Sequence, residues 1–355
     1  MGAFSAVGAW PGVIAELIAG QDLSAEVAAA SLERMLDGSA TDAQIAAFIV
    51  ALRIKGETVE EVTGLVGSML AVSSPLQLDD PQQTLDIVGT GGSAALAGKA
   101  FNVSTMASIV AAAAGATVCK HGNRKASSTS GSTDLLESLG IEVELNGEGV
   151  LSCMRSAGVG FAFARIFHPS MRHVAPVRAQ LGVPTVFNVL GPLSHPGNVG
   201  RQVLGVSDPR LMALVPQVLQ RRGLTRAWVL HGEGGLDELT TTGATQVTEL
   251  FEGELRSFVI NPEDVGMSRV SVEKIRVGGP EENAAAARSI LAAEKGPLRD
   301  MVVLNAAAGL VVASCAQNLA EGVELAAASI DDGRAAEVLE KLVAASQAAS
   351  PLPSN

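Results

Sequence analysis

One run of the sequence, from Asp86 to Gly131, concentrates residues whose types and spacing suit the binding of phosphate groups. It opens with DIVGTGGS, where glycines follow a strand-like segment, and continues through FNVST to KHGNRKASSTSG. Successive glycines let neighbouring backbone N–H groups converge on an anion, and the first turn of a helix adds free N–H groups and a positive dipole end. The run therefore predicts a cradle for a heavily phosphorylated ligand, although a strand-to-helix turn without a ligand would use the same glycines.

Three groups of residues in this run are candidates for phosphate contacts. Lysine acts on phosphate as a point charge, and arginine and serine add hydrogen-bond donors. The basic segment carries no carboxylate from Lys120 to Thr133, which favours an anion site over a solvated charged face. Helix capping alone would also explain the hydroxyl-rich second group. The groups are Gly89, Thr90, Gly91 and Gly92; Asn102, Ser104 and Thr105; and Lys120, Arg124, Ser127 and Ser128.

A pair of carboxylates, Asp237 and Glu238, follows a strand-like segment and the glycine-rich sequence HGEGG. Adjacent carboxylates repel each other unless a cation lies between them. Hard oxygen ligands, with a phosphate as a further ligand, suit Mg²⁺. The pair is therefore a candidate metal site, and an exposed acidic turn is the alternative.

The composition narrows the class of protein. The chain has 355 residues, of which 47% are hydrophobic and 3% aromatic with no Tyr, so we expect a core of Ala, Val and Leu. The net charge of −12 argues against non-specific nucleic-acid binding. Three cysteines lack metal-ligand spacing, as in a reduced cytosolic protein. No signal sequence is visible, and the Ala-rich stretches 106–119 and 301–316 suit buried helices, so we expect a cytoplasmic protein without a membrane partner.

The order of patterns along the chain predicts an α/β protein with a small N-terminal all-helical domain and a large α/β domain around a mostly parallel sheet. Thr41 with Gln44 and Thr58 with Glu61 are capping-box pairs at two helix starts. The helical part is expected to pack on the rest of the chain or on a second copy. Expected strands are LDIVG, ATVCK, GFAFA, RAWVLHG, SFVI and Lys274 to Val277. The expected domains are 1–76 with inserted helices at about 169–195, then 77–168 with 196–345, and a flexible tail at 346–355.

The ordered set GTGG, NVST, KHGNR, HPSMRHVAPVR, GVPTVFNVLGPL and GLDELTTTG resembles the anthranilate phosphoribosyltransferase family over nearly the whole chain. The resemblance implies transfer of phosphoribose from 5-phosphoribosyl-1-pyrophosphate (PRPP) to the amino group of anthranilate, the second step of tryptophan biosynthesis. It also implies two Mg²⁺ ions bound with PRPP, a homodimer formed through the helical domain, and association with anthranilate synthase.

On the positions that match the family's motifs, the resemblance implies three sets of site residues. No side chain is expected to act as a covalent nucleophile, because the neutral aromatic amine needs positioning more than activation. A guanidinium such as that of Arg178 recognises a carboxylate with two hydrogen bonds. PRPP is expected at Gly89, Thr90, Gly91, Gly92, Ser93, Asn102, Val103, Ser104, Thr105, Lys120, Arg124, Ser127, Ser128 and Ser132; anthranilate at Gly89, His121, Asn123 and Arg178; and metal at Ser104, Asp237 and Glu238.

Three features depart from the family's pattern. Ser93 stands where the family usually has Asp, the segment Ala94 to Ala100 is longer than usual and contains Lys99, and Arg165 stands where Pro is common. Two alternatives stay open, the second of which is suggested by Ser93 and the longer segment. One is an enzyme resembling pyrimidine nucleoside phosphorylases, which share the two-domain architecture and a related phosphate loop. The other is a non-catalytic paralogue that binds phosphoribosyl compounds.

Overall fold

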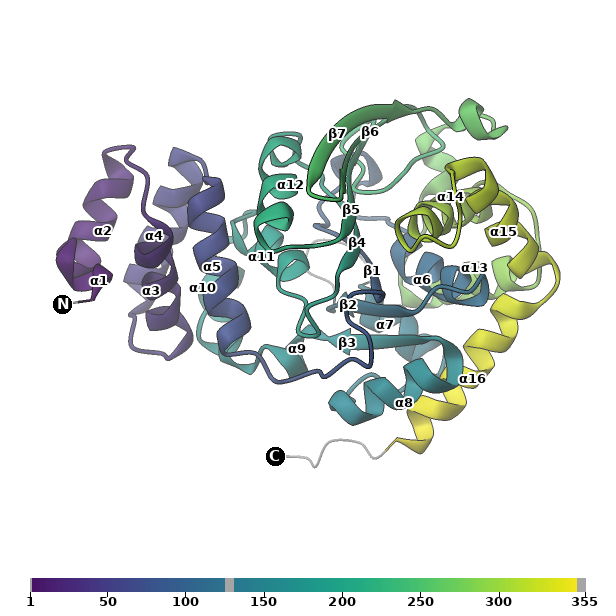
Figure 1. Ribbon diagram of the computed structural model, residues 1–355, viewed down its shortest axis with the longest axis horizontal. Coiled ribbons are helices and arrows are strands. Elements are labelled where there is room, and N and C mark those ends of the chain that lie inside the picture. Colours follow the sequence, from purple (N-terminus) through teal and green to yellow (C-terminus); the bar gives the residue numbers. More distant parts are fainter. Residues whose placement is uncertain (1, 125–130, 350–355) are drawn as a thin grey trace. The chain divides into compact units, whose positions relative to one another are not determined.

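The computed structural model describes residues 2–124 and 131–349, and the chain divides into two compact units. The helical unit consists of Met1–Pro75 and Phe167–Pro196, and the sheet unit consists of Leu76–Ile166 and Gly197–Asn355. The fold class is confirmed: one unit is all-helical, and the other is α/β with a mostly parallel sheet (Figure 1). No helix in the described ranges has the length and apolar character that a membrane span requires.

Local signals account for the helices of the helical unit. The two predicted capping boxes are confirmed, because the Thr41 and Thr58 hydroxyls each accept the backbone N–H three residues later. Phe48, Ile49 and Leu52 on one helix are almost fully buried. The helices are α1 (Ala3–Ala6), α2 (Ala9–Ile18), α3 (Ala25–Leu36), α4 (Asp42–Lys55), α5 (Val59–Ala71), η2 (Pro169–His173), α10 (Ala175–Leu181) and α11 (Phe187–Leu193).

The sheet unit contains seven strands in the order β3-β2-β1-β4-β5-β6-β7. The first five strands in chain order are parallel, and β6 and β7 run antiparallel to their neighbours. The strands are β1 (Leu85–Gly89), β2 (Val118–Gly122), β3 (Val159–Phe163), β4 (Arg201–Gly205), β5 (Arg226–Gly232), β6 (Thr245–Phe251) and β7 (Glu254–Ile260).

Three strand assignments and one tail segment differ from the predictions. The strands β4 and β6 were not predicted, and the strand expected at Lys274 to Val277 is wrong, because Val272–Ile275 forms a 3₁₀ helix, η4. The prediction that residues 346–355 form a flexible tail is wrong for the first of these residues, which are helical. The last helix continues to Ala348, and Ser346 is fully buried, with its hydroxyl accepting the Glu142 N–H.

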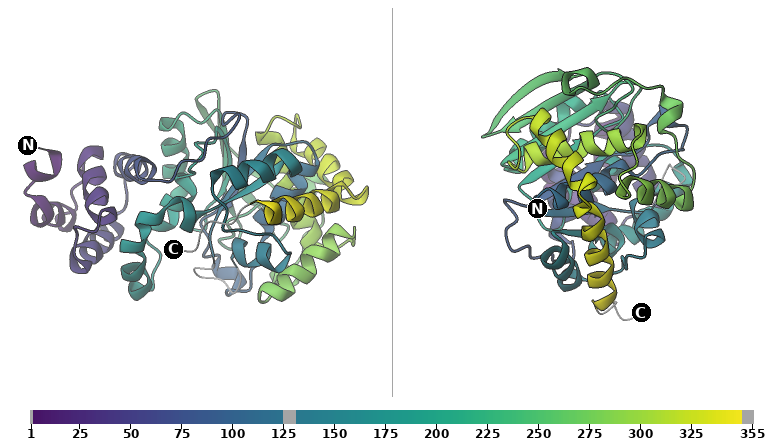
Figure 2. Two further views of the ribbon diagram at one scale, coloured as in Figure 1. Left: turned by 90° about the horizontal axis from the view of Figure 1, so that it is seen from below. Right: turned by 90° about the vertical axis from the view of Figure 1, so that its right-hand side faces the viewer.

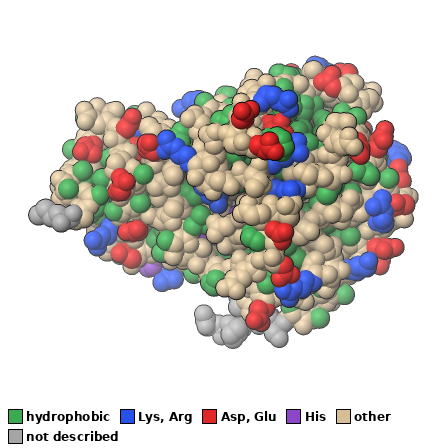
Figure 3. Space-filling model, viewed as in Figure 1, with side chains coloured by type: hydrophobic (Ala, Val, Ile, Leu, Met, Phe, Trp, Pro, Cys, Tyr) green, Lys and Arg blue, Asp and Glu red, His purple; other side chains and the backbone are tan. Residues whose placement is uncertain are grey.

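Helices cover both faces of the sheet. Figure 1 shows α12 on one side and α6 and α14 on the other, and Figure 2 shows α16 crossing over the layer that contains α6. The stretches at 106–119 and 301–316 were expected to form buried helices, and α6 and α14 are buried almost throughout. Acidic and basic side chains are interspersed on the face shown in Figure 3. The helices are η1 (Ala94–Leu96), α6 (Val103–Ala113), α7 (Ser132–Ser138), α8 (Gly147–Ala157), α9 (Ala164–Phe167), α12 (Leu211–Arg221), η3 (Pro262–Val265), α13 (Pro280–Leu291), α14 (Pro297–Val312), α15 (Leu319–Asp331) and α16 (Arg334–Ala348).

The strand order places a crevice at the carboxyl end of β1. From β1 the chain proceeds outward to β2 and β3, and then returns to the other side of β1 to form β4 and β5. Ligands of open α/β sheets bind at the carboxyl edge where the strand order reverses in this way. The topology therefore points to the loops that follow β1, β4 and β5.

Candidate active site

The glycine turn that follows β1 lines a cavity of about 400 Å³ at this edge. Gly91 and Gly92 adopt φ values of 70° and 86°, which favour glycine. Two amides of the turn are already engaged: the Thr90 N–H donates to the Gly205 carbonyl, and the Gly91 N–H donates to Oδ2 of Asp237 at 2.7 Å. A pyrophosphate could therefore use these two amides only by replacing the hydrogen bonds that they make within the chain.

Asp237 lies at the centre of this arrangement. Its second carboxylate oxygen accepts the Ser93 hydroxyl at 2.6 Å. A Cβ at Gly89 would collide with this carboxylate, and a Cβ at Gly205 would collide with the Asp237 backbone. Glycines at the ends of β1 and β4 therefore let the carboxylate loop approach the sheet. Ser93, the departure from the family's Asp, is a hydrogen-bond partner of the candidate metal ligand.

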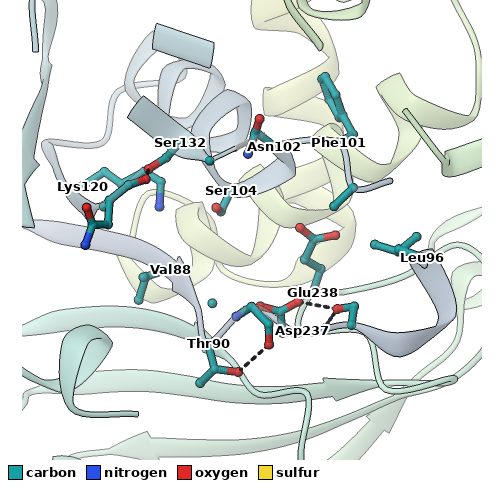
Figure 4. Close-up of a pocket in the computed structure, with 18 of the residues that line it drawn as sticks. Val88, Thr90, Leu96, Phe101, Asn102, Ser104, Lys120, Ser132, Asp237 and Glu238 are labelled. Atoms are coloured by element: carbon teal, nitrogen blue, oxygen red, sulfur yellow. Dashed lines mark hydrogen bonds between the residues drawn. The ribbon is translucent and has the colours of Figure 1, made fainter. Parts of the chain in front are cut away.

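Glu238 is half-buried, and its carboxylate points into the same space as the Ser104 hydroxyl (Figure 4). Burial, followed by the charge of Asp237, raises the pKa of the Glu238 carboxyl well above its ordinary value, and Lys120 opposes the shift. A divalent cation between the carboxylates would remove this repulsion. In the described part of the chain, no three His, Cys, Asp or Glu side chains form a ligand group. The oxygens present still fit Mg²⁺ if a phosphate or water completes the set.

The predicted helix start after the glycine turn is present. Helix α6 begins at Val103 with Asn102 as its N-cap residue, and Asn102 and Ser104 line the cavity. Val103 and Thr105 are buried and are not among the residues of the cavity wall. The Val103 N–H donates to the Phe101 carbonyl and the Thr105 N–H donates to the Asn102 carbonyl, so the start of α6 offers the cavity its positive dipole end rather than a full set of free N–H groups.

The basic segment that begins in β2 is only partly available to an anion. Lys120 and His121 line the cavity but are 2% and 3% exposed. The Arg124 guanidinium binds both carboxylate oxygens of Glu137 at 2.6 and 2.7 Å and lies 3.5 Å from Asp134. These hydrogen bonds raise the pKa of Arg124 further. The segment from Lys120 to Thr133 has no carboxylate of its own, but α7 supplies Asp134 and Glu137 to Arg124 across the loop.

The remaining predicted residues fall into three places. Asn123 and Ser132 line the cavity, where the Ser132 hydroxyl donates to the Asn123 carbonyl at 3.0 Å. Ser127 and Ser128 lie outside the described residues. Arg178 lies on α10 of the helical unit, where its guanidinium covers the Phe187 ring at 5.1 Å, and burial lowers its pKa.

Several residues of the site were missed by the sequence analysis. Ser207, after β4, donates its hydroxyl to the Gly91 carbonyl at 2.7 Å, and its N–H donates to the Thr90 hydroxyl. Leu96 and Phe101 form an apolar wall of the cavity. Lys99 and Arg165, singled out as additional cations, are exposed and are not in the cavity wall. Ser207 is far from the glycine turn in the sequence, so only the folded structure shows that the two are in contact.

Comparisons with known proteins agree with this architecture. Residues 81–336 match the family model described as the glycosyl transferase family a/b domain, and residues 11–73 match its helical bundle domain. The anthranilate phosphoribosyltransferase of Methylocella silvestris is 46% identical, with 95% of each chain covered. That of Nocardioides sp. is 48% identical over 95% of this chain and 98% of the relative.

Solved structures give the same result. Anthranilate phosphoribosyltransferase from Thermus thermophilus is 44% identical with a TM-score of 0.87, covering 95% of this chain and 99% of that one. The Saccharomyces cerevisiae enzyme in complex with PRPP and Mg is 29% identical with a TM-score of 0.85, covering 95% and 98%. The resemblance inferred from the ordered motifs is confirmed. The chain belongs to the anthranilate phosphoribosyltransferase family.

Proposed function

We propose that this chain transfers the 5-phosphoribosyl group from PRPP to the amino group of anthranilate, giving N-(5-phosphoribosyl)anthranilate and pyrophosphate in the second step of tryptophan biosynthesis. The observation that carries the proposal is one cavity at the reversal of strand order. It joins the glycine turn, the first turn of α6, the buried Lys120 and the Asp237–Glu238 pair. The relatives and solved structures of the same family support it.

The phosphate-binding elements have distinct roles in this proposal. The glycine turn and the positive dipole end of α6 face the pyrophosphate, and the Asn102 and Ser104 side chains add polar contacts. Lys120 supplies a fixed positive charge, while Arg124 reaches the ligand by exchanging its carboxylate partners. The turn residues, Ser132 and the serines at 127 and 128 complete the proposed PRPP contacts.

Asp237, Glu238 and Ser104 are the residues that would hold Mg²⁺, and two ions are proposed. When bound, Mg²⁺ neutralises negative charge on the pyrophosphate as it departs. The chain's own contribution is to hold two carboxylates close together before the ligand arrives. The Gly91 amide and Ser93 hydroxyl fix Asp237 in place, and Glu238 completes the pair.

The reaction needs orientation more than acid–base chemistry. The amine lone pair forms the new N–C1 bond while the C1–O bond breaks, and pyrophosphate leaves with that electron pair. The amine nitrogen then loses a proton to water or to the departing pyrophosphate. Positive charge develops on the ribose and negative charge on the leaving group, so prearranged donors around the pyrophosphate lower the barrier. Arg178 is proposed to bind the anthranilate carboxylate, and Gly89, His121 and Asn123 to contact the substrate.

The proposal extends to assembly and location. Ile18 and Ile54 in the helical unit are 75% and 82% exposed, and Val50 is also exposed. Such apolar side chains on α2 and α4 support a homodimer formed through the helical unit. Association with anthranilate synthase and a cytoplasmic location are proposed from the family resemblance.

The test is loss of anthranilate fluorescence on addition of PRPP and Mg²⁺. The variant Asp237→Ala/Glu238→Ala should lose metal-dependent turnover, and Arg178→Ala should mainly raise the KM for anthranilate. Asp79→Ala and Arg172→Ala, which change exposed residues, are the matched controls. Wild-type turnover in the carboxylate variant would refute the metal site. Phosphorolysis of thymidine would favour the phosphorylase alternative, and PRPP binding without turnover would favour a non-catalytic role.

A further inference from the structure

The central sheet opens between β1 and β2, next to the cavity. β1 pairs with β4 from Leu85 to Gly89, and β2 pairs with β3 from Val118 to Gly122. Between β1 and β2, by contrast, Leu85 and Val118 are the only two residues of the described sheet that pair across the strands. If this parallel ladder continued, the Ile87 carbonyl would accept the His121 N–H. Instead of this hydrogen bond, the Ile87 carbonyl and the His121 N–H each bind a side chain.

Two charged side chains satisfy the groups that this ladder bond would have used. The His121 N–H donates to Oδ1 of Asp86 at 3.1 Å, and the Ile87 carbonyl accepts Nζ of Lys120 at 2.7 Å. The second oxygen of Asp86 accepts Nε2 of Gln202 on β4 at 3.0 Å. Asp86 therefore links β1 to both neighbouring strands while being fully buried.

This arrangement is an energetically unfavourable way to join two strands. Burial raises the pKa of Asp86 to about 6 although Lys120 opposes the shift. Burial also lowers the pKa of Lys120, opposed by Asp86 first and then by Asp237 and Glu238. A regular ladder or an apolar pair would avoid both desolvation penalties. The open strand ends, however, form the cavity floor, because Val88 and Gly89 of β1 and Lys120, His121 and Gly122 of β2 all line it.

We propose that Asp86 and Lys120 form a clamp that holds β1 and β2 apart, and that Asp86 is a positioning residue for phosphate binding, acting through Lys120 and His121. The clamp keeps the ammonium group of Lys120 at the cavity floor and fixes the backbone of β2 beside it. The inference rests on the proposed function in one respect: the phosphate is taken to be the pyrophosphate part of PRPP.

The experiment measures binding of pyrophosphate with Mg²⁺ by calorimetry in wild type, Asp86→Asn, Lys120→Met and the double variant. Asp86→Asn should weaken binding about tenfold, because Lys120 loses the nearby negative charge and the hydrogen bond to the His121 N–H is weakened. Lys120→Met should weaken it at least as much, and the loss in the double variant should be smaller than the sum of the two single losses, because Asp86 acts in part through Lys120. In turnover, Asp86→Asn should raise the KM for PRPP and leave the KM for anthranilate unchanged.

The matched control is Glu249→Gln, which removes another buried carboxylate of the same sheet. Glu249 binds Arg226 and Arg256 and is not in the cavity wall, so its loss should leave pyrophosphate affinity unchanged. Unchanged affinity in Asp86→Asn, or an effect that adds fully to that of Lys120→Met, would overturn the proposal.

Folding failure is also informative. If Asp86→Asn does not fold, the double variant should regain a Tm closer to wild type, since it removes both buried charges. A double variant less stable than either single variant would contradict the clamp. Because binding is measured without turnover, a wild-type chain that binds Mg-pyrophosphate but forms no product would refute the proposed function and leave this inference standing.

Discussion

The substitution Gly205→Ala tests whether the end of β4 positions the carboxylate loop. A Cβ at Gly205 would occupy the position of the Asp237 backbone carbonyl, and the Gly205 carbonyl also accepts the Thr90 N–H at 2.9 Å. One methyl group therefore presses on the candidate metal ligand from a strand that also holds the glycine turn. Asp237 must move, and its hydrogen bonds with Gly91 and Ser93 must lengthen or break.

The size of the effect follows from what the methyl group meets. Overpacking a tight site costs about 1–3 kcal/mol, and the obstacle here is backbone, which cannot rotate away, so we expect about 3 kcal/mol. In a domain of this size each kcal/mol shifts Tm by about 2–4 °C, which gives a fall of about 6–12 °C. Displacement of Asp237 should also raise the KM for Mg²⁺ by about tenfold or more, equivalent to about 1.4 kcal/mol.

The assay combines thermal unfolding with a Mg²⁺ titration of turnover. Gly67→Ala is the control, because Gly67 is exposed on α5 and an added Cβ has no atom within 4 Å. This substitution should stabilise the helix by about 1 kcal/mol and leave the Mg²⁺ dependence unchanged. A Gly205→Ala variant with wild-type Tm and wild-type Mg²⁺ dependence would show that Asp237 is not held against β4.

Two further predictions concern buried carboxylates. The pKa of the Asp86 carboxyl is raised from 3.8 to about 6. The folded state therefore binds the carboxyl proton more tightly than the unfolded chain does. The resulting contribution to the free energy of unfolding is complete below pH 4 and is lost as the pH rises through 6. The unfolding free energy of wild type relative to Asp86→Asn should therefore fall by about 3 kcal/mol between pH 4 and 7 in urea titrations, and a flat difference would contradict the shift. In the helical unit, Glu61 is fully buried and accepts from Leu23, Lys55 and Thr58, so Glu61→Gln should cost about 3 kcal/mol by urea unfolding. The exposed Glu33→Gln is its control, and equal stabilities of these two variants would refute the argument.

Local signals explain why much of the site could be predicted from the sequence. The glycines after β1, the start of α6 at Val103 and the Asp237–Glu238 pair each follow a recognisable segment within a few residues. The capping boxes at Thr41 and Thr58 are local in the same sense. Such features depend on neighbours along the chain, so sequence reasoning reaches them.

Features that depend on strand pairing were not predicted. Strand β4 begins with Arg201 and Gln202, polar residues whose place in a central strand is explained by contacts with distant residues such as Asp86. Arg124 reaches Glu137 only because α7 folds back over the loop. The opening between β1 and β2 depends on where their pairing stops, and no local pattern in either strand encodes that point.

The charges of the cavity explain how an acidic chain can accommodate a pyrophosphate. Among the described residues, the charged side chains in its wall are Lys120, Arg124, Asp237 and Glu238, and their formal charges cancel. Arg124 is in addition shared with Glu137. The described side chains therefore supply no net positive charge, and among the described parts of the site the attraction comes from the positive dipole end of α6 and from a cation that the two carboxylates recruit. Without a cation, the Asp237–Glu238 pair would repel the pyrophosphate. Binding of the cation and binding of the pyrophosphate therefore depend on each other.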